Sequence, residues 1–429
     1  MSAARGRRVE RTSNSSFVIA VDGFAQAGQL DSQLANQDEG ADRDFEAERG
    51  GVSAAAAAFL RAEPYRGPRL VVDLSKVEAA YRRLSAGARP AALYYAVKSN
   101  PHPEILRRLD RLGARFDVAS RGEIARCLDL GIAAGRLSFG NTVKRESDIA
   151  FAHQAGVPLF AFDAEEELEK LARAAPGAEV FCRLLIEDSA ADWPLSRKFG
   201  CAPDMAERLM LRARELGLRP VGLSFHVGSQ MRDPTGWREA VRQASLLWKR
   251  LQLRGLRLDL LNLGGGFPAR YDEAVPGVRA YAGDVLELVR DAFGALPPRI
   301  VIEPGRGLVG DAGVLEAEVL LVSRKSDADA RRWVYLDIGK FGGLAETMDE
   351  MIRYRIMSDR DREETGPCIL AGPTCDSADV LYEKNPVELP IGLRAGDRVR
   401  LPATGAYTTT YAAVWFNGIE PLEEHVIEG

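Results

Sequence analysis

The stretch LYYAVKSNP, residues 93–101, places five apolar residues directly before Lys98 and a Ser-Asn-Pro turn. The apolar run is typical of a buried strand, and an unpaired ammonium at its end is costly to bury. One interpretation of Lys98 is a strand-end side chain that extends its amine to solvent. The other is a nucleophilic role for the amine. The rest of the chain decides between them.

Seven more apolar, β-prone runs follow, and amphipathic stretches typical of helices separate them. The first five runs recur about every 20 to 22 residues. The eight runs are 93–97, 115–120, 137–141, 159–163, 179–186, 220–227, 258–266 and 299–306. Helical patterns include 103–113, 121–130, 164–175, 206–216 and 237–253. Eight βα units in series predict a (β/α)8 barrel of the TIM type.

The pattern changes after about residue 310, where short strand-like runs follow one another without long helices. These runs are 314–323, 332–337, 368–371, 397–402 and 406–414. They predict a C-terminal, mostly antiparallel β domain over 311–429. The run 70–74 either joins that domain or leads into the barrel. We therefore divide the chain into an N-terminal extension (1–50), a barrel with its lead-in segment (51–310) and the β domain.

Composition excludes several classes of protein. A net charge of -5, with 46% hydrophobic and 28% charged residues, is ordinary for a soluble globular protein and gives no basic surface for nucleic acid. No apolar run reaches the length of a membrane span. The five cysteines are scattered and odd in number, so we expect a reduced, cytoplasmic protein without a metal site. The first 50 residues pass from Arg-rich to acidic, which favours a partly disordered extension.

Polar residues and glycines gather at the C-terminal ends of the predicted barrel strands. They are Lys98, Asp117, Asn141, Arg183, His226, the glycines 264–266, Glu303 and Arg306. Barrel enzymes carry their active sites at this end. Each residue alone has a structural explanation, but the common position of all of them favours an active site.

The loops after the seventh and eighth strands have the character of a phosphate site. Gly264-Gly265-Gly266 leaves backbone N–H groups accessible to an anion, although a flexible turn has the same composition. Barrel phosphate sites favour these two loops, and Arg306 adds a bidentate donor. Glu303 either pairs with Arg306 or faces the ring nitrogen of a pyridine cofactor. His226 is either a satisfied core histidine or a ring stacked on that cofactor. With Lys98 as a Schiff-base amine, the set predicts pyridoxal phosphate.

Seven motifs, in order over about residues 70 to 420, resemble the ornithine decarboxylases, which belong to the alanine-racemase-like pyridoxal-phosphate enzymes. The motifs are YAVK (95–98), FDVAS (116–120), FHVGS (225–229), GGGFP (264–268), EPGR (303–306), GPTCD (372–376) and GAYT (405–408). The resemblance implies that Lys98 links covalently to the cofactor. It also implies that His226 stacks on the ring, that Glu303 meets the pyridine nitrogen, and that Asp117 and Arg183 line the pocket. The implied phosphate ligands are Ser229, Gly265, Gly266, Arg306 and Tyr407.

The same resemblance implies how the substrate is held. Cys375 steers protonation after carbon dioxide leaves, and the catalytic set is then Lys98, Cys375, Glu303 and His226. The substrate-binding set is Asp349, Glu350, Cys375, Asp376, Tyr407 and Phe416. Asp376 departs from the Cys-Glu-Ser motif of diaminopimelate decarboxylases and, with Asp349 or Glu350, offers carboxylates to a distal ammonium. A gapless match aligns Glu350 with the distal-amine aspartate of the eukaryotic enzymes, which leaves the preferred chain length open.

The expected reaction is decarboxylation of L-ornithine to putrescine and carbon dioxide, a step of polyamine biosynthesis. Lysine, both substrates, or another basic amino acid on the same fold is the alternative. A catalytically inactive regulatory homologue is disfavoured because Lys98, Glu303 and Arg306 are all present, and a racemase is disfavoured by the GPTCD loop. The expected partners are a small basic amino acid and a second copy of the chain. That homodimer shares its active sites, with Lys198 and Asp379 as a pair across its interface. Neither nucleic acid nor a membrane is expected.

Overall fold

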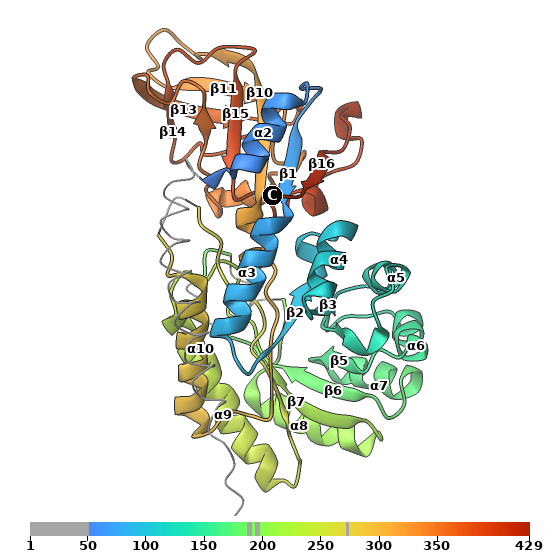
Figure 1. Cartoon of the computed structure of the whole chain (residues 1–429). Helices are drawn as coiled ribbons and strands as arrows, with labels where there is room; N and C mark the ends of the chain where they lie inside the picture. Colours follow the sequence, from blue (N-terminus) through green and yellow to red (C-terminus); the bar gives the residue numbers. More distant parts are fainter. Residues whose placement is uncertain (1–50, 187–190, 194–197, 272–273) are drawn as a thin grey trace, which may run out of the picture. The chain divides into compact units, whose positions relative to one another are not determined.

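The computed structural model describes residues 51–186, 191–193, 198–271 and 274–429 (Figure 1). The predicted N-terminal extension, 1–50, lies outside these ranges. The described part contains an eight-stranded barrel and a second β-sheet, whose strands come from before and after the barrel in sequence.

The first structure is a closed barrel of eight parallel strands, β2 to β9, paired in chain order. The strands are β2 (Ala92–Ala96), β3 (Arg115–Val118), β4 (Leu137–Phe139), β5 (Leu159–Phe162), β6 (Glu179–Arg183), β7 (Arg219–Ser224), β8 (Leu260–Asn262) and β9 (Arg299–Ile302). Pairing of β9 with β2 closes the ring. Each strand overlaps one of the eight predicted runs, so the predicted barrel is confirmed.

Helices α4 to α10 follow the first seven barrel strands in turn (Figure 1). They are α4 (Pro103–Arg111), α5 (Arg121–Asp129), α6 (Glu146–Ala155), α7 (Glu165–Ala174), α8 (Pro203–Glu215), α9 (Arg238–Leu253) and α10 (Val278–Phe293). The eighth position is taken by α3 (Leu74–Gly87), which precedes β2 and packs against both α10 and α4. A Cβ on Gly87 would lie 2.1 Å from the Arg279 carbonyl oxygen, so only glycine allows α3 and α10 to approach this closely.

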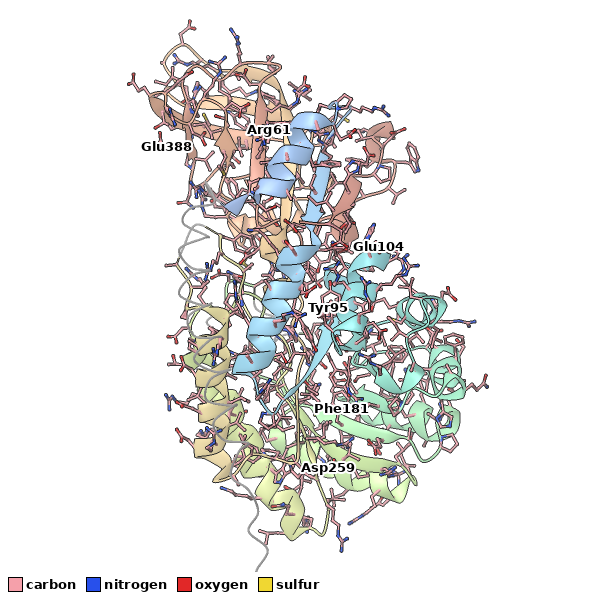
Figure 2. All side chains as sticks on the ribbon, in the orientation of Figure 1. Arg61, Tyr95, Glu104, Phe181, Asp259 and Glu388 are labelled. Carbon is pink, nitrogen blue, oxygen red and sulfur yellow. The ribbon has the colours of Figure 1, made fainter. Side chains whose placement is uncertain are left out.

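Side-chain alternation along the strands divides the barrel core into two layers. Tyr94 packs with Phe181 and Val301 in a buried cluster built only from barrel strands. Its neighbour Tyr95 belongs instead to the larger cluster that includes the covering helices, and its ring meets Phe116 edge-on at 6.5 Å. Figure 2 labels Tyr95 and Phe181 on their strands. The period of two in a strand thus explains why a continuous apolar run is needed here.

The second sheet has eight strands, and five of its seven pairings are antiparallel. Its strands are β1 (Arg69–Asp73), β10 (Gly313–Ser323), β11 (Arg332–Leu336), β12 (Met357–Ser358), β13 (Thr365–Ala371), β14 (Val387–Pro390), β15 (Arg398–Pro402) and β16 (Glu423–Ile427). Only β1 with β16 and β11 with β13 are parallel. The predicted mostly antiparallel β structure is therefore confirmed.

The predicted strand over 406–414 is wrong. The segment contains a short 3-10 turn, η7 (Thr409–Tyr411), and no strand. Tyr407 has a φ of +57°, in the left-handed region, and such a residue interrupts the extended backbone of a strand. The Thr- and Tyr-rich composition favoured a strand, but the segment forms a loop. In this loop the Tyr407 N–H donates to the Ser99 carbonyl at 2.9 Å.

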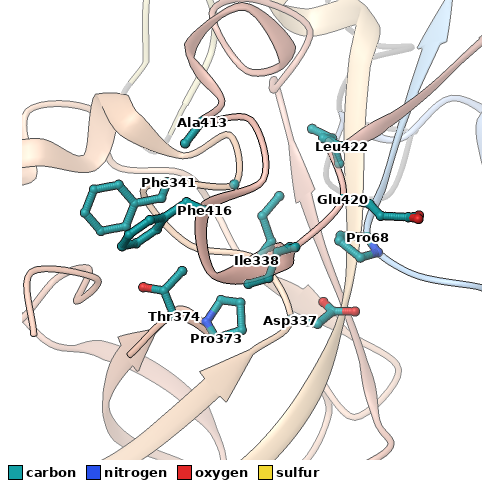
Figure 3. Close-up of a pocket in the computed structure, with 12 residues that line it drawn as sticks. Pro68, Asp337, Ile338, Phe341, Pro373, Thr374, Ala413, Phe416, Glu420 and Leu422 are labelled. Atoms are coloured by element: carbon teal, nitrogen blue, oxygen red, sulfur yellow. The ribbon is translucent and has the colours of Figure 1, made fainter. Parts of the chain in front are cut away.

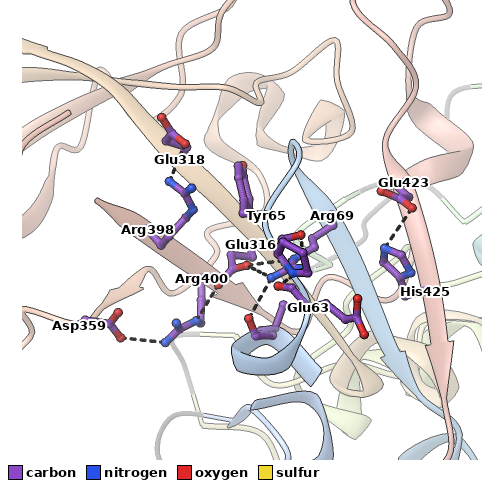
Figure 4. Close-up of polar contacts among 12 residues, drawn as sticks. Glu63, Tyr65, Arg69, Glu316, Glu318, Asp359, Arg398, Arg400, Glu423 and His425 are labelled. Atoms are coloured by element: carbon purple, nitrogen blue, oxygen red, sulfur yellow. Dashed lines mark hydrogen bonds and ion pairs between the residues drawn. The ribbon is translucent and has the colours of Figure 1, made fainter. Parts of the chain in front are cut away.

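The run 70–74 forms β1, which joins the second sheet by pairing with β10 and β16. Beside it, helix α2 (Ala54–Ala62) precedes β1, and Arg69 forms a buried ion pair with Glu316 at 2.7 Å. Arg400 reaches the other Glu316 oxygen at 3.2 Å (Figure 4). The chain then passes from Asp73 straight into α3, whose first turn Asp73 caps. The alternative left open by the sequence is thus resolved in favour of the sheet.

In the described ranges, no helix combines the length and hydrophobicity needed to cross a bilayer. The same ranges contain no group of three or more His, Cys, Asp or Glu side chains arranged to hold a metal ion. All five cysteines are free thiols, and only Cys375 is exposed. The closest pair of sulfurs, in Cys182 and Cys201, is 3.6 Å apart and unbonded.

Candidate active site

Lys98 follows β2 directly, in the 3-10 turn η2 (Val97–Ser99). Its Nζ lies 2.8 Å from Oδ2 of Asp117, a buried carboxylate on β3. Burial alone would lower the pKa of Lys98, but its interactions with Asp117, Tyr407 and Glu303 outweigh burial and raise the pKa above its usual range. With 45% of its side chain exposed, Lys98 is a charged, accessible amine held by an acid at the barrel mouth.

Glu303 comes directly after β9, at the same end of the barrel. Its Oε1 accepts a hydrogen bond of 2.5 Å from Nδ2 of Asn262, the last residue of β8. Burial and repulsion by Asp117 raise the pKa of Glu303 to about 7, although Lys98, Asn262 and Arg183 act against the rise. The pair of Glu303 with Arg306, considered from the sequence, is not formed, because the carboxylate partner of Arg306 is Glu346.

His226 follows β7 and presents a neutral ring. Its Nδ1 accepts a 2.9 Å hydrogen bond from the Gly228 N–H, which leaves the proton on Nε2. Burial, with the positive charges of Arg183 and Lys98, lowers the pKa of His226 well below its usual value. A Cβ on Gly265 would lie 2.9 Å from Nε2, so the ring lies against the glycine loop.

The loops after β7, β8 and β9 converge on the guanidinium of Arg306. Its Nε and Nη2 donate to the Ser229 hydroxyl at 3.2 and 3.1 Å. The Tyr407 ring lies 5.0 Å from its Cζ. Arg183, at the end of β6, has its guanidinium 4.8 Å from the Phe199 ring instead. The structure therefore joins Ser229, Arg306 and Tyr407, while the charge of Arg183 acts on Glu303 and His226 at the same mouth.

The glycine loop after β8 is shaped for close approach of an anion. Gly264 and Gly266 have φ of +70° and +120°, and a Cβ on Gly266 would lie 2.8 Å from the Gly228 carbonyl oxygen. Within the described residues, neither Gly265 nor Gly266 donates its N–H to another protein group. Two available N–H groups next to a buried guanidinium and a hydroxyl are the donors that a phosphate accepts from. The residues of the mouth thus fit pyridoxal phosphate.

Tyr407 is the predicted substrate residue that lies in this cluster, whereas Cys375 and Asp376 form no hydrogen bond or ion pair with it among the described residues. Cys375 is exposed and is held by Asn417, whose Oδ1 accepts from the Cys375 N–H at 3.0 Å and whose Nδ2 lies 3.3 Å from Sγ. Asp376 is exposed, and among the described residues its carboxylate accepts only the Ala378 N–H. In those residues no hydrogen bond, ion pair or ring contact links Cys375 or Asp376 to Lys98.

Phe416 packs beside the loop that carries Cys375. Its ring centroid lies 5.0 Å from that of Phe341, and both rings border a cavity of about 20 Å³ with Pro373 and Thr374 (Figure 3). That volume holds about one water molecule. Phe416 therefore supports the Cys375 loop, and the cavity is too small for an amino acid.

The two candidate acids of the 3-10 segment η6 (Ala345–Glu350) differ in their surroundings. Glu350 accepts from Lys384 N, Asn385 N and Asn385 Nδ2, and it pairs with Arg353. Asp349 is 79% exposed, and the nearest cation, Lys384 Nζ, is 3.9 Å away. Asp349 is thus the acid with accessible oxygens.

Asp379, expected to face Lys198 across a dimer interface, is 2% exposed. Its oxygens accept from Lys340 N and from the N–H and hydroxyl of Thr374. Within one chain these contacts hold Asp379 in its own turn, and its pairing with Lys198 across a dimer interface stays a prediction. Lys198 lies over the Phe199 ring at 5.2 Å.

Three residues with clear roles in this geometry were not identified from the sequence: Asn262, Glu346 and Asn417. Asn262 carried a signal, because its polar side chain interrupts the apolar run 260–263 two residues before the first glycine. Glu346 and Asn417 carried none, because each acts on a residue about 40 positions away along the chain.

A (β/α)8 barrel that places an accessible amine, a phosphate-type donor set and a buried carboxyl group at one mouth is the site of an alanine-racemase-like pyridoxal-phosphate enzyme. Comparison with known proteins agrees. Residues 74–310 match the family model of the pyridoxal-dependent decarboxylases, pyridoxal binding domain.

Relatives span most of the chain. A lysine/ornithine decarboxylase of Selenomonas ruminantium is 33% identical over 353 residues, covering 82% of this chain and 87% of that protein. An ornithine decarboxylase of Schizosaccharomyces pombe is 33% identical over 374 residues, covering 85% and 84%. A lysine/ornithine decarboxylase from Vibrio vulnificus, solved with cadaverine, matches with a TM-score of 0.78 at 31% identity, covering 88% of this chain and 100% of that one. The chain belongs to the pyridoxal-dependent amino-acid decarboxylases, and its cofactor is pyridoxal phosphate.

Proposed function

We propose that this chain decarboxylates L-ornithine, releasing carbon dioxide and putrescine. The observation that carries the proposal is the Lys98 amine at the barrel mouth, between the acids Asp117 and Glu303. Relatives named as ornithine or lysine/ornithine decarboxylases support a basic amino acid as the substrate. Bound pyridoxal phosphate supplies an electron sink for the electron pair that remains when the carbon–carbon bond breaks.

The residues of the mouth then have distinct tasks. Lys98 holds the cofactor covalently, and Asp117 keeps the amine in place. Glu303 holds a proton at the pyridine nitrogen, a task for which its raised pKa and its Asn262 contact prepare it. The neutral His226 ring lies on the face of the cofactor without adding a charge.

The remaining proposed contacts bind the two ends of the reactants. Arg306 and the loops beside it hold the phosphate, with Ser229, Gly265, Gly266 and Tyr407 as the other ligands. Arg183 lines the pocket. The distal ammonium of the substrate pairs with Asp376 and with Asp349 or Glu350, next to Phe416. Cys375 returns a proton to the α-carbon after carbon dioxide has left.

The direct test is incubation of the purified protein with ornithine, lysine, arginine and diaminopimelate, followed by identification of the amine. Putrescine as the main product supports the proposal. Cadaverine formed from lysine at an equal or higher kcat/KM contradicts ornithine as the preferred substrate. It favours the dual specificity named in two relatives.

The distal-amine assignment gives a graded expectation. Asp376→Asn and Asp349→Asn should each raise the KM for ornithine about 10- to 100-fold, because a charged hydrogen bond is lost. Glu350→Gln should have a smaller effect, because that carboxylate already caps the turn at Lys384 and Asn385. Steady-state kinetics measure the values.

The matched control is Asp359→Asn, which changes an exposed acid that pairs with Arg400 away from the site. Its KM should equal that of the wild type. If all four variants share the wild-type KM for ornithine, the substrate amine binds elsewhere.

We also propose that Cys375 of the partner subunit completes each site of a twofold dimer. Its support is the separation of the exposed Cys375 loop from the mouth cluster within one chain. Mixing Lys98→Ala protein with Cys375→Ala protein under subunit exchange should restore activity to about a quarter of wild type. Random pairing makes about half the dimers hybrids, and each hybrid has one intact site.

Exchange itself is monitored with differently tagged copies. Each variant alone provides the baseline activity. If tagged hybrids form and activity stays at that baseline, both residues act within one chain and the shared site is wrong.

A further inference from the structure

The guanidinium of Arg306 is held on two edges by its own chain. Its Nε–Nη2 edge faces the Ser229 hydroxyl at 3.2 and 3.1 Å. Its terminal Nη1–Nη2 edge makes a bidentate contact with Glu346 at 2.7 and 2.5 Å. Nη1 also donates to the Tyr271 hydroxyl at 2.5 Å. Each edge therefore has its own partner.

The pair with Glu346 is almost completely shielded from water. The side chains of Arg306 and Glu346 are 2% and 4% exposed. Burial alone would lower the pKa of Arg306, but Glu346 and Tyr271 raise it well above its usual value. A bidentate contact in such surroundings fixes the plane of the guanidinium as well as its position.

The location of Glu346 makes this contact unusual for a simple ion pair. Glu346 lies in η6, which also carries Asp349 and Glu350. Its backbone carbonyl accepts the Ile352 N–H at 3.0 Å, so the contact to Arg306 is anchored in a hydrogen-bonded turn. A carboxylate close to a phosphate ligand also repels the phosphate, so charge alone gives no reason for an acid here.

We propose that Glu346 is a positioning residue that orients Arg306 so that its Nε–Nη2 edge faces the phosphate-binding loops. The inference rests on the proposed role of Arg306 as a phosphate ligand. Glutamine in place of Glu346 accepts on one oxygen only and sets an NH2 group against the guanidinium donors. The edge that faces Ser229 then loses its fixed direction.

The test measures cofactor binding rather than turnover. Cofactor-free wild type and Glu346→Gln are titrated with pyridoxal phosphate and with pyridoxal, which lacks the phosphate, and the visible absorbance gives both dissociation constants. We expect Glu346→Gln to raise the dissociation constant for pyridoxal phosphate about 10- to 100-fold and to leave that for pyridoxal within about twofold of wild type. The reason is that one charged partner is lost at the phosphate end only. Glu346→Asp should recover part of the loss.

If Glu346 acted only as a charge, Glu346→Gln would bind pyridoxal phosphate more tightly, because a repelling carboxylate is removed. Tighter or unchanged binding therefore overturns the inference, as does an equal loss for pyridoxal. Glu316→Gln is the matched control, since Glu316 is equally buried and pairs with Arg69 and Arg400 in the sheet. It should bind both compounds as the wild type does.

Tyr271→Phe provides a second test of how Arg306 is oriented, and it leaves the charge of the Arg306–Glu346 pair unchanged. It removes one hydrogen bond from Nη1 and should weaken pyridoxal phosphate about threefold, with pyridoxal unaffected. Should Glu346→Gln fail to fold, wild-type affinity in Tyr271→Phe overturns the inference. Ornithine turnover is measured on the same wild-type preparation. Normal cofactor binding without putrescine contradicts the proposed substrate and leaves the role of Glu346 standing.

Discussion

Lys98→Ala is expected to abolish the visible absorbance of the bound cofactor and to lower kcat/KM for decarboxylation by about 10³-fold or more. The magnitude is in the range seen when a positioned catalytic group is removed. The physical reason is the loss of the only amine that Asp117 holds at the mouth among the described residues. Absorbance spectra after reconstitution with pyridoxal phosphate, with steady-state kinetics, provide the measurement.

Lys325→Ala is the matched control, because Lys325 stacks on Trp333 in the second sheet, outside the site. It should keep both the absorbance and the activity. A colourless wild type that pyridoxal phosphate does not restore contradicts the role of Lys98, and so does an alanine variant that retains the wild-type spectrum.

Glu303→Gln is expected to keep the fold and lower kcat about 10²- to 10³-fold, the range for removal of one preorganised electrostatic partner. Without an acid at this position, no group holds a proton at the pyridine nitrogen. Single-turnover measurements of carbon dioxide release separate this step from substrate binding. Turnover within a few-fold of wild type would mean that Glu303 serves only its contact with Asn262.

The raised pKa of Glu303 adds a pH signature in the cofactor-free protein. Its pKa in the folded state is about 7, against 4.5 as the ordinary value. Between these pH values the unfolded chain has released the proton and the folded chain retains it, so stability falls as the pH rises through this window. Urea unfolding at pH 5 and pH 7.5 should show this fall in wild type relative to Glu303→Gln. If the difference in unfolding free energy between wild type and Glu303→Gln is the same at both pH values, the pKa of Glu303 is not raised.

His226 titrates in the opposite sense. Its pKa is lowered in the fold, so protonation of the unfolded chain costs stability as the pH falls below about 6.5. The residue is present in both proteins, and its contribution cancels in the difference. The comparison of wild type with Glu303→Gln therefore isolates the contribution of Glu303.

The barrel was predictable because each strand is buried on both faces and must be a continuous apolar run, as Leu93–Val97 is. The mouth was predictable because parallel strands end together, so Lys98, Asp117 and Glu303 had to be neighbours. The loop at 406–414 was not predictable from the sequence, because the positive φ of Tyr407 depends on its contact with Ser99, far away in the sequence. The contact between Arg306 and Glu346 could not be predicted either, because the two residues are 40 positions apart in the sequence.

The strand order of the second sheet constrains the order in which the chain can fold. One of its two parallel pairs, β1 with β16, comes from opposite ends of the described chain, and the whole barrel lies between the two strands in sequence. During synthesis, β1 leaves the ribosome long before β16 does, and the edge of β1 that β16 covers stays open until residues 423–427 appear. We infer that the barrel can form first and that β16 pairs with β1 late and completes the sheet. Loss of residues 423–427 would then leave the unpaired N–H and C=O groups of β1 exposed at an edge prone to aggregation.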